Sequence, residues 1–378
     1  MRILYLMTEP FGIGGVQSDL LTLSQDLNER GHEVYLAALP GVLLEEVKAK
    51  GARHVEIDFN FQGLGSMMRS IRALREAVQA NRIELIAPQS VRSSIIAFLA
   101  TRLLPFRYRV AGTGRRVPIV TTIHNIHDPR HFRYAGRILQ VCADYIIFES
   151  HYERNRLLAS GLAKGKSTVI HSGIDTDRFV PQAMDQALAS RLGLDPTRHF
   201  VFGIVARLSE EKGHSYLIEA FASVCGELPN AKLLIVGDGP LRVEVQQQVA
   251  ELDLEDKVIF AGLQRDIPAF LALMNVFVLS STRESFPLAA REAMAAGKAV
   301  VAPRIGGCPE VVDEGVTGYL FECRNVAELA RRLAEVAQGQ RWIEFGRSAR
   351  IRVEGLFSRR AWVDGDEAVY LRWHSKFK

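Results

Sequence analysis

The segment HFVFGIVARLSEEKG, residues 199–213, joins an apolar run of aromatic and β-branched residues to a polar loop that carries Arg207 and Lys212. Similar runs recur on both sides of it, separated by stretches of helical periodicity. Such alternation predicts βαβ units and a parallel sheet. In the first half of the chain the runs are 2–7, 32–39, 83–88, 117–124 and 143–150; in the second half they are 199–208, 231–240, 257–262, 275–281 and 298–303.

The repeated pattern predicts two domains, because so many strands exceed what one open sheet holds and 378 residues exceed one ordinary domain. Turn residues cluster in HSGIDTDRFVP (171–181) before the pattern restarts. We therefore place an N-terminal domain at 1–173 and a C-terminal domain at 174–356. The predicted fold class is α/β, with two Rossmann-like, doubly wound parallel-sheet domains facing across a cleft. Ligands of such domains bind outside the carboxyl ends of the strands.

The composition excludes several other classes of protein. A net charge of +4 gives no indication of a nucleic-acid partner. Four cysteines without CxxC pairing predict reduced thiols and neither a disulfide framework nor a zinc site. The apolar start MRILYLM is too short for a signal peptide, and no stretch approaches the roughly 20 apolar residues of a membrane span. We expect a cytoplasmic protein.

Glycine-containing loops follow three of the predicted strands or runs. In EPFGIGGVQ (9–17) a dinucleotide fingerprint would need glycine where Gln17 stands, which disfavours a nicotinamide enzyme. A phosphate-binding loop and a tight turn without a ligand remain as the two interpretations of this segment. The loop with Arg207 and Lys212 could bind a diphosphate, or it could be a solvated turn with local ion pairs. VGDGP (236–240), with Gly237, allows close approach of a ligand or is only a turn.

RESFPLAAREAMAAG (283–297) holds two glutamates that flank a predicted helix start. We expect Ser285 to cap a helix that begins at Phe286, with Pro287 in its first turn and the free amides facing a ligand. Glu284 lies just outside this helix and Glu292 about two turns along it. That spacing suits two distant parts of one ligand better than one scissile bond. The alternative is charge on the helix surface, balanced by Arg291 and Lys298.

Three other segments contain histidines or aspartates of the kinds that bind metal ions, but their spacing or position does not support a metal site. TTIHNIHDPRHF (121–132) contains three histidines whose spacing matches no zinc pattern, and only His124 directly follows a predicted strand. The other two, His127 and His131, are expected in a loop. DTD (175–177) and DGD (364–366) resemble metal-binding D-x-D sequences, but DTD stands in the interdomain connection. We predict no metal site.

Taken in order, these segments resemble retaining glycosyltransferase family 4, a family of nucleotide-sugar transferases with the GT-B fold. The resemblance runs nearly end to end, and the order and spacing of its motifs make it specific. It rests on the segments GIGGVQSDLLTLSQDLNERGHEVYL, TTIHN, VIHSGIDTDRF, GIVARLSEEKG, LLIVGDGP, VIFAGL, ESFPLAAREAMAAGKAVVA and GGCPEVV.

This resemblance implies roles for individual residues. Glu284 would hydrogen-bond hydroxyls of the donor sugar, and Glu292 would hold the ribose. Arg207 and Lys212 would contact the diphosphate. His124 would stand near the reacting sugar, so the implied catalytic set is His124, Arg207, Lys212 and Glu284.

Further donor contacts are implied at the backbone. Gly15, with Gly14 before it, matches the glycine whose amide approaches the diphosphate or the acceptor. Pro287 replaces a frequent glycine, so Phe286 and Leu288 must supply amides there; Ala299 replaces a frequent proline. The last segment, 357–378, matches a helix that crosses back onto the first domain.

The resemblance implies retaining, metal-independent transfer with no cofactor, from a nucleoside-diphosphate sugar (UDP favoured) to a hydroxyl of a glycan or lipid-linked acceptor. Bacterial surface polysaccharide, lipopolysaccharide or glycolipid synthesis is the expected setting. The basic-apolar segments 66–79 and 101–116 could contact an anionic membrane at its inner face, or pack in the core with solvated arginines. A nicotinamide dehydrogenase, a GT-B sugar-nucleotide epimerase and a non-catalytic sugar-nucleotide binding protein remain as alternatives.

Overall fold

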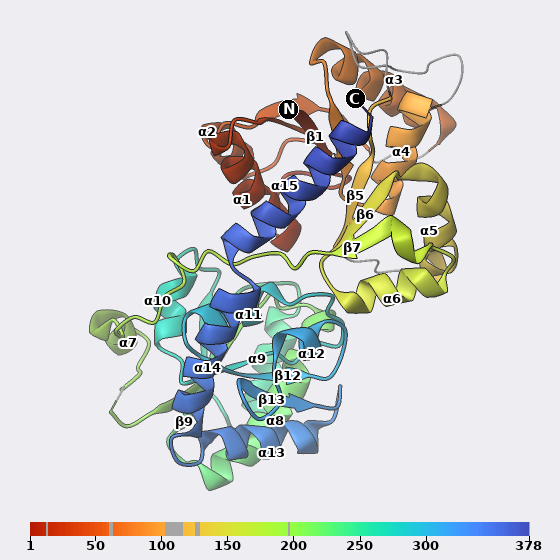
Figure 1. Ribbon diagram of the computed structural model, residues 1–378. Coiled ribbons are helices and arrows are strands. Elements are labelled where there is room, and N and C mark those ends of the chain that lie inside the picture. The colour runs from red at the N-terminus through yellow and green to blue at the C-terminus, as the bar shows by residue number, and fades with distance from the viewer. Residues whose placement is uncertain (13, 60–62, 103–115, 125–128, 196, 378) are drawn as a thin grey trace. The chain divides into compact units, whose positions relative to one another are not determined.

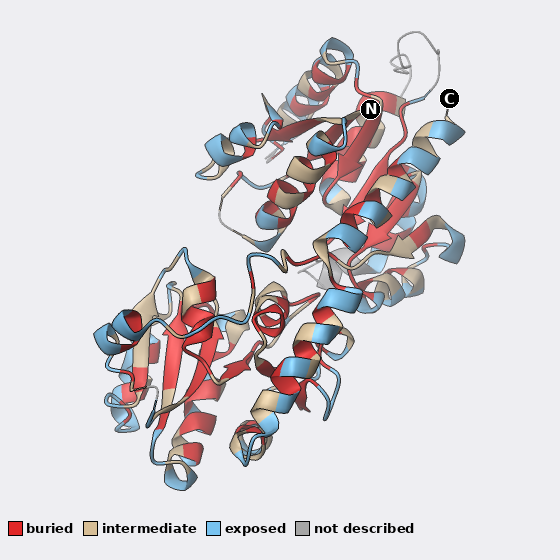
Figure 2. Cartoon of the chain, turned by 60° about the vertical axis from the view of Figure 1, so that its left-hand side comes forward, coloured by how far each residue is buried: buried red, intermediate tan, exposed pale blue. Residues whose placement is uncertain are grey.

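The chain forms two compact units in a computed structural model, which describes residues 1–378 except 13, 60–62, 103–115, 125–128, 196 and 378 (Figure 1). Unit 1 comprises Met1–Gly173 and Arg360–Lys378, and unit 2 comprises Ile174–Arg359. Parallel β-sheet covered by helices forms each unit, and Figure 2 shows that buried residues fill the strands. The predicted α/β class with two Rossmann-like domains is confirmed.

Unit 1 is built on parallel strands in the order β3-β2-β1-β4, followed by β5-β6-β7. A parallel bridge between Ile86 and Ile119 joins β4 to the segment that leads into β5. The strands are β1 (Arg2–Leu6), β2 (Glu33–Ala38), β3 (Arg53–Glu56), β4 (Leu85–Pro88), β5 (Val120–Ile123), β6 (Tyr145–Phe148) and β7 (Ser167–Val169). The helices are α1 (Gly15–Glu29), α2 (Leu44–Ala49), α3 (Leu64–Ala80), α4 (Val91–Arg102), α5 (Pro129–Cys142), α6 (His151–Ala159) and α15 (Arg359–Lys376), with a 3-10 turn η1 (Lys164–Lys166).

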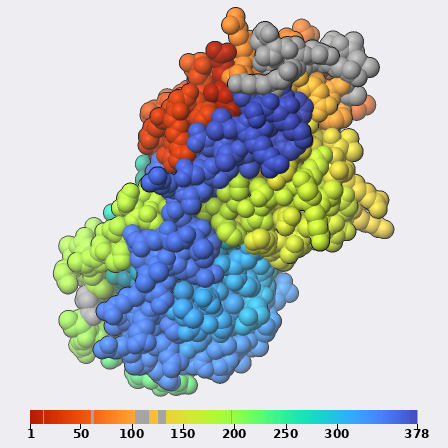
Figure 3. Space-filling model, in the orientation of Figure 1, coloured from red at the N-terminus to blue at the C-terminus, as the bar shows by residue number. Residues whose placement is uncertain are grey.

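Helix α15 returns the end of the chain to unit 1, where it packs against residues from the N-terminal strands and helix (Figure 3). Trp362, Val363 and Tyr370 are buried in the same apolar cluster as β1 and α1. The Tyr5 hydroxyl donates to the Tyr370 hydroxyl at 3.3 Å, and Arg30 pairs with Glu367 at 2.6 Å. The last helix therefore completes the core of unit 1.

Unit 2 contains one parallel sheet in the order β10-β9-β8-β11-β12-β13. The chain starts at β8 in the middle, winds outward to β10, and returns to β11 beside β8, which is the doubly wound arrangement. The strands are β8 (Phe200–Val205), β9 (Ala231–Val236), β10 (Val258–Gly262), β11 (Val276–Val278), β12 (Ala299–Pro303) and β13 (Gly318–Phe321). The helices are α7 (Gln186–Arg191), α8 (His214–Glu227), α9 (Arg242–Glu251), α10 (Ile267–Ala272), α11 (Leu288–Ala295), α12 (Cys308–Val311), α13 (Val326–Ala337) and α14 (Arg341–Leu356), with a 3-10 turn η2 (Glu210–Lys212).

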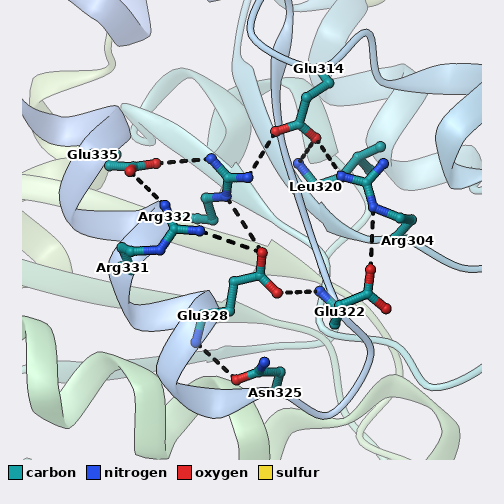
Figure 4. Close-up of polar contacts among 9 residues, drawn as sticks. All are labelled: Arg304, Glu314, Leu320, Glu322, Asn325, Glu328, Arg331, Arg332 and Glu335. Atoms are coloured by element: carbon teal, nitrogen blue, oxygen red, sulfur yellow. Dashed lines mark hydrogen bonds and ion pairs between the residues drawn. The ribbon is translucent and has the colours of Figure 1, made fainter.

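An ion-pair network joins the carboxyl end of β12 to the carboxyl end of β13 and to α13 (Figure 4). Glu314 is its centre, since it pairs with Arg304 at 3.1 Å and with Arg332 at 3.1 Å. Arg332 also reaches Glu335 at 3.0 Å, and Arg304 reaches Glu322 at 3.4 Å. Linked pairs of this kind are worth more than isolated surface pairs. They anchor the chain just before the glycines that follow β12.

Candidate active site

The loops at the carboxyl ends of β8 and β11 bring three predicted site residues to one edge of the unit 2 sheet. The strand order reverses between these two strands, and doubly wound sheets bind ligands at such a point. Arg207 and Lys212 follow β8, and Glu284 follows β11. The sequence alone placed each of them after a strand, and the topology makes their strands neighbours.

Lys212 and Glu284 form a direct ion pair, with the Lys212 Nζ 2.7 Å from the Glu284 Oε1. The Ser281 hydroxyl donates to the same Oε1 at 2.8 Å. The two loops are also joined through their backbones, because the Thr282 N–H donates to the Glu211 carbonyl at 2.8 Å. An ammonium has three N–H donors, so two on Lys212 remain for an anion. Sequence reasoning assigned both residues but missed their contact and Ser281.

Arg207 adds a second cation to this edge. Its side chain is exposed just beyond β8 and forms no ion pair with any residue that the structure describes. The loop ends at Gly213, which has φ +62 and precedes α8; a Cβ there would lie 2.2 Å from the Ser280 carbonyl oxygen. The cations are therefore carried on a loop that packs closely against the β11 loop.

Two glycines are required by close backbone contacts around the same loops. Gly237 has φ +139, and a Cβ on it would lie 1.9 Å from the Ala206 carbonyl oxygen. Gly306 has φ +54, and a Cβ on it would lie 1.6 Å from the Glu284 carbonyl oxygen. Loop-to-loop packing thus accounts for glycine at both positions, and a donor contact at Gly237 stays a prediction.

The predicted helix start after Glu284 is wrong by two residues. Helix α11 begins at Leu288, its N-cap is Pro287 (φ −66, ψ 107), and no side chain caps it. A residue before proline is disfavoured in helical conformation, which accounts for the helix not beginning at Phe286. Ser285 is consequently not its N-cap. Phe286 is buried instead, with its ring under the Arg291 guanidinium at 4.1 Å. Leu288 is the first helical residue, and its N–H has no intrahelical acceptor.

Glu292 consequently lies in the second turn of α11, closer to the helix start than predicted. It is half-buried, and burial raises the pKa of its carboxyl to about 7, against the opposing charges of Arg178 and Arg291. Arg291 is 1% exposed, so the alternative of a solvated helix-surface charge fails for it. Burial also lowers the pKa of Lys298 to about 8. A half-buried carboxyl with a raised pKa on this edge fits a binding group better than a solubilising one.

His124 directly follows β5 in unit 1 and is 8% exposed. Its Nδ1 lies 2.7 Å from the Glu149 Oε1, and its Nε2 lies 2.7 Å from the Gln89 Oε1. Burial disfavours the imidazolium, but the charge and hydrogen bond of Glu149, together with the charges of Asp19 and Asp366, more than offset it and raise the pKa of His124. Gln89 and Glu149 were missed by sequence reasoning, although each also ends a strand.

Gly14 and Gly15 lie at the start of α1, where the N-terminal domain was predicted to approach a ligand. Gly14 is the N-cap in extended conformation, and Gly15 is the exposed first helical residue. A Cβ on Gly14 would meet only the end of the Gln17 side chain, at 2.4 Å from Oε1. The helix start therefore presents free N–H groups with no side chain covering the first residue.

One group in unit 1 has the residue types of a metal site. Asp19, His124 and Glu149 present ligand atoms within 4.8 Å of one another. The 2.7 Å between His124 Nδ1 and Glu149 Oε1 is a hydrogen bond, whereas two ligands of one ion stand about 3 Å apart or more at usual bond lengths. The facing atoms of His124 and Glu149 are used by each other, so the group does not fit a metal ion as it stands.

The D-x-D sequence at 175–177 has a structural role. The Asp175 Oδ1 accepts from the N–H groups of Asp177 and Arg178 at 3.1 and 3.0 Å, and its Oδ2 pairs with Arg359 at 3.0 Å. Of the other residues of the histidine segment, His127 lies outside the described residues, as does the side chain of His131.

Segment 66–79 lies in helix α3. Ile71, Leu74 and Val78 are buried in the core of unit 1, and Arg72 pairs with Glu76 at 2.9 Å. These three apolar residues therefore pack in the core, while contact of the segment with a membrane stays a prediction. Segment 101–116 lies outside the described residues over 103–115. Among the described helices, none has the length and apolar character needed to cross a bilayer.

Two family models together match most of the chain. "Glycosyltransferase Family 4" matches residues 13–178, and "Glycosyl transferases group 1" matches residues 190–349. The 2-deoxystreptamine glucosyltransferase of Streptomyces kanamyceticus is 33% identical over 77% of this chain and 80% of its own. The chain belongs to glycosyltransferase family 4. Another relative of this glycosyltransferase, the N-acetyl-alpha-D-glucosaminyl L-malate synthase of Bacillus anthracis, is 27% identical over 92% of this chain and 91% of its own.

A solved structure shows the same fold. Anabaena HepE in complex with UDP and glucose matches with a TM-score of 0.81 at 23% identity, over 98% of this chain and 99% of that chain. The GT-B fold is therefore confirmed. The protein is a GT-B glycosyltransferase that uses a nucleotide sugar, and the alternatives of a dehydrogenase, an epimerase or a non-catalytic binding protein are not favoured.

Proposed function

We propose that this glycosyltransferase transfers a sugar from a UDP-sugar to a hydroxyl acceptor, with retention of anomeric configuration and without a metal ion. The observation that carries the proposal is the Lys212–Glu284 pair at the point where the unit 2 sheet reverses. It offers a cation and a carboxylate side by side where a diphosphate and its attached sugar would meet. The HepE structure with UDP and glucose supports a uridine donor.

Each charged group of unit 2 has a part of the donor to bind. Lys212, with two spare N–H donors, and the exposed Arg207 would hold the diphosphate. Glu284 uses its Oε1 for Lys212 and Ser281, which leaves Oε2 to accept from a sugar hydroxyl. Glu292, about one turn along α11, would accept from the ribose hydroxyls.

For the chemical step we propose attack on the same face from which the diphosphate leaves. The bond from the anomeric carbon to the phosphate oxygen breaks, and the bond to the acceptor oxygen forms. The acceptor proton passes to the departing phosphate oxygen, so no protein base is needed. Lys212 and Arg207 stabilise the charge that develops on the diphosphate, a role in which one fixed donor is worth about 10²–10³ in kcat.

Metal independence follows from the same pair of cations, since they provide the charge that a divalent ion would otherwise supply. Transfer should proceed at an unchanged rate after exhaustive EDTA treatment. A rate that collapses in EDTA and returns only with Mg²⁺ or Mn²⁺ would contradict this part of the proposal.

On the acceptor side we propose a hydroxyl of a glycan or of a lipid-linked sugar, in surface polysaccharide, lipopolysaccharide or glycolipid synthesis. Two relatives carry names with small hydroxylated compounds, L-malate and 2-deoxystreptamine. Small acceptors therefore belong in the same screen.

The deciding experiment is proton NMR of the reaction with UDP-sugars and an acceptor panel. The anomeric coupling constant of the first product, read before any equilibration, distinguishes retention from inversion. An α-linked glycoside from an α-linked donor supports the proposal, and a β-linked product contradicts it. Conversion of the UDP-sugar to an epimer without acceptor would show the epimerase alternative to be correct.

A further inference from the structure

Four segments far apart in the sequence converge on the His124 ring. Asp19 comes from α1, Gln89 follows β4, Glu149 follows β6, and Asp366 comes from α15. These residues are at most 8% exposed and line a cavity of about 10 Å³, close to the volume that a single water needs. The ring is therefore held among buried polar side chains in a small pocket of unit 1 that apolar residues also line.

The orientation of Gln89 fixes what it offers to His124. Its Nε2 donates to the Ala87 carbonyl at 2.9 Å, so the amide oxygen is the atom that faces the ring. An amide oxygen only accepts hydrogen bonds. The Nε2 of His124 must therefore carry a proton.

The Nδ1 side meets a second acceptor. The Glu149 Oε1 lies 2.7 Å away, a length typical of a charge-assisted hydrogen bond from an N–H to a carboxylate. An ionised carboxylate accepts only. With both ring nitrogens facing acceptors, the arrangement stabilises the imidazolium, in which both nitrogens donate.

We propose, on the basis of the proposed function, that Glu149 and Gln89 are positioning residues which keep His124 as a doubly donating imidazolium. His124 then contributes a fixed positive charge at the carboxyl end of β5, and it does not take the acceptor proton. This deepens the mechanism above. The family resemblance places His124 near the reacting sugar, and an imidazolium there cannot act as the base that accepts the acceptor proton. The proton then has the leaving phosphate as its destination.

The charges that surround His124 support this assignment. The carboxylates of Glu149, Asp19 and Asp366 each raise the pKa of His124, in opposition to burial. Burial, with the charge of Glu149, raises the pKa of Asp366 to about 8, and its Oδ1 has no hydrogen-bond partner among the described residues. Near neutral pH Asp366 is thus mostly protonated, and Glu149 and Asp19 are the neighbours that favour the imidazolium.

The charge state can be read directly by long-range ¹H–¹⁵N NMR of the full chain labelled at histidine, with H124Q identifying the resonance. At pH 8 both ring nitrogens should show the shifts of an imidazolium. In E149Q the charge is lost while an acceptor oxygen is kept, so His124 should titrate at or below its ordinary value of about 6.5. E149D should restore the wild-type behaviour. A neutral ring in the wild type at pH 8 would overturn the proposal without any need for a variant.

Kinetics distinguish positioning from a general structural role. E149Q should lose about tenfold in kcat at pH 8, the size expected for one charge-assisted hydrogen bond, and should recover as the pH falls and His124 is protonated again. The matched control is E153Q, which alters another buried glutamate, 1% exposed on α6, and should leave the resonance and the pH profile unchanged. An equal loss at every pH would contradict the proposal. Failure of the proposed function would instead appear as absent transfer in the wild type, with the NMR result unaffected.

Discussion

Gly306→Ala tests whether the contact between the β12 and β11 loops sets the position of Glu284. Gly306 has φ +54, and a Cβ would stand 1.6 Å from the Glu284 carbonyl oxygen. Ordinary carbon–oxygen contact is about 3.3 Å, so one of the two backbones must move by roughly 1.7 Å. That movement would break the 2.7 Å contact between Lys212 and Glu284. Misplacement by about 1 Å can cost 10²-fold in rate, so kcat/KM should fall by about 10²-fold or more.

Gly315→Ala is the matched control. Gly315 has φ +74, and a Cβ would meet nothing within 4 Å. Both variants carry the same left-handed strain, roughly 1–2 kcal/mol in the free energy of unfolding, but only Gly306→Ala adds the collision. Chemical denaturation and kcat/KM are measured for both, with Gly315→Ala expected to keep near wild-type activity. The reasoning is refuted if the two variants lose kcat/KM by the same factor.

Three further predictions follow from charged residues. Lys212→Ala should lower kcat by about 10²–10³-fold, because it removes a cation that stabilises the leaving diphosphate. The control variant Lys257→Ala, at the amino end of β10, should keep the wild-type kcat. Comparable rates for the two variants in steady-state assays would exclude this role of Lys212. Nucleotide affinity should rise as the pH increases through about 7, where the Glu292 carboxyl ionises. Glu292→Gln should abolish that pH dependence in calorimetric titrations. An unchanged pH profile in the variant would show that Glu292 does not bind the nucleotide. Asp366 has a pKa raised from about 3.9 to about 8, so its carboxyl costs stability that grows as the pH rises from about 4 and is complete above about 8. Asp366→Asn should therefore be more stable than wild type at pH 9, by at most roughly 6 kcal/mol, with the difference vanishing near pH 4. Denaturation curves that differ equally at both pH values would contradict this.

The sequence predicted most of the fold because long apolar runs with β-branched residues allow few alternatives. The runs at 199–208 and 231–240 became β8 and β9, for example. Strands β3 (RHVE), β7 (STV) and β13 (GYLF) were not predicted, since each has only three or four residues and is recognised only by its partners in the sheet. The start of α11 was misplaced because the N-cap preference of serine was weighed above the restriction that proline imposes on the residue before it.

The sequence was enough to predict which site residues follow the strands, but it was not enough to predict their contacts with one another. Lys212 and Glu284 are 72 residues apart in the chain, and their pairing depends on β8 and β11 being neighbours. His124 and Gln89 are 35 residues apart, and the amide orientation that makes Gln89 an acceptor depends on the Ala87 carbonyl. Such contacts arise from sheet order, which the local pattern does not contain.

The most direct test of nucleotide-sugar use is thermal stabilisation of the protein by UDP, GDP, ADP and NAD⁺, measured for the wild type and for the Arg207→Ala/Lys212→Ala variant. Binding at a hundred times the Kd adds about 2.7 kcal/mol to the free energy of unfolding, which gives a visible shift in Tm. We predict that UDP stabilises the wild type, that NAD⁺ does not, and that the double variant loses most of the shift. Stabilisation by NAD⁺ alone, or a UDP shift that persists undiminished in the double variant, would contradict the account.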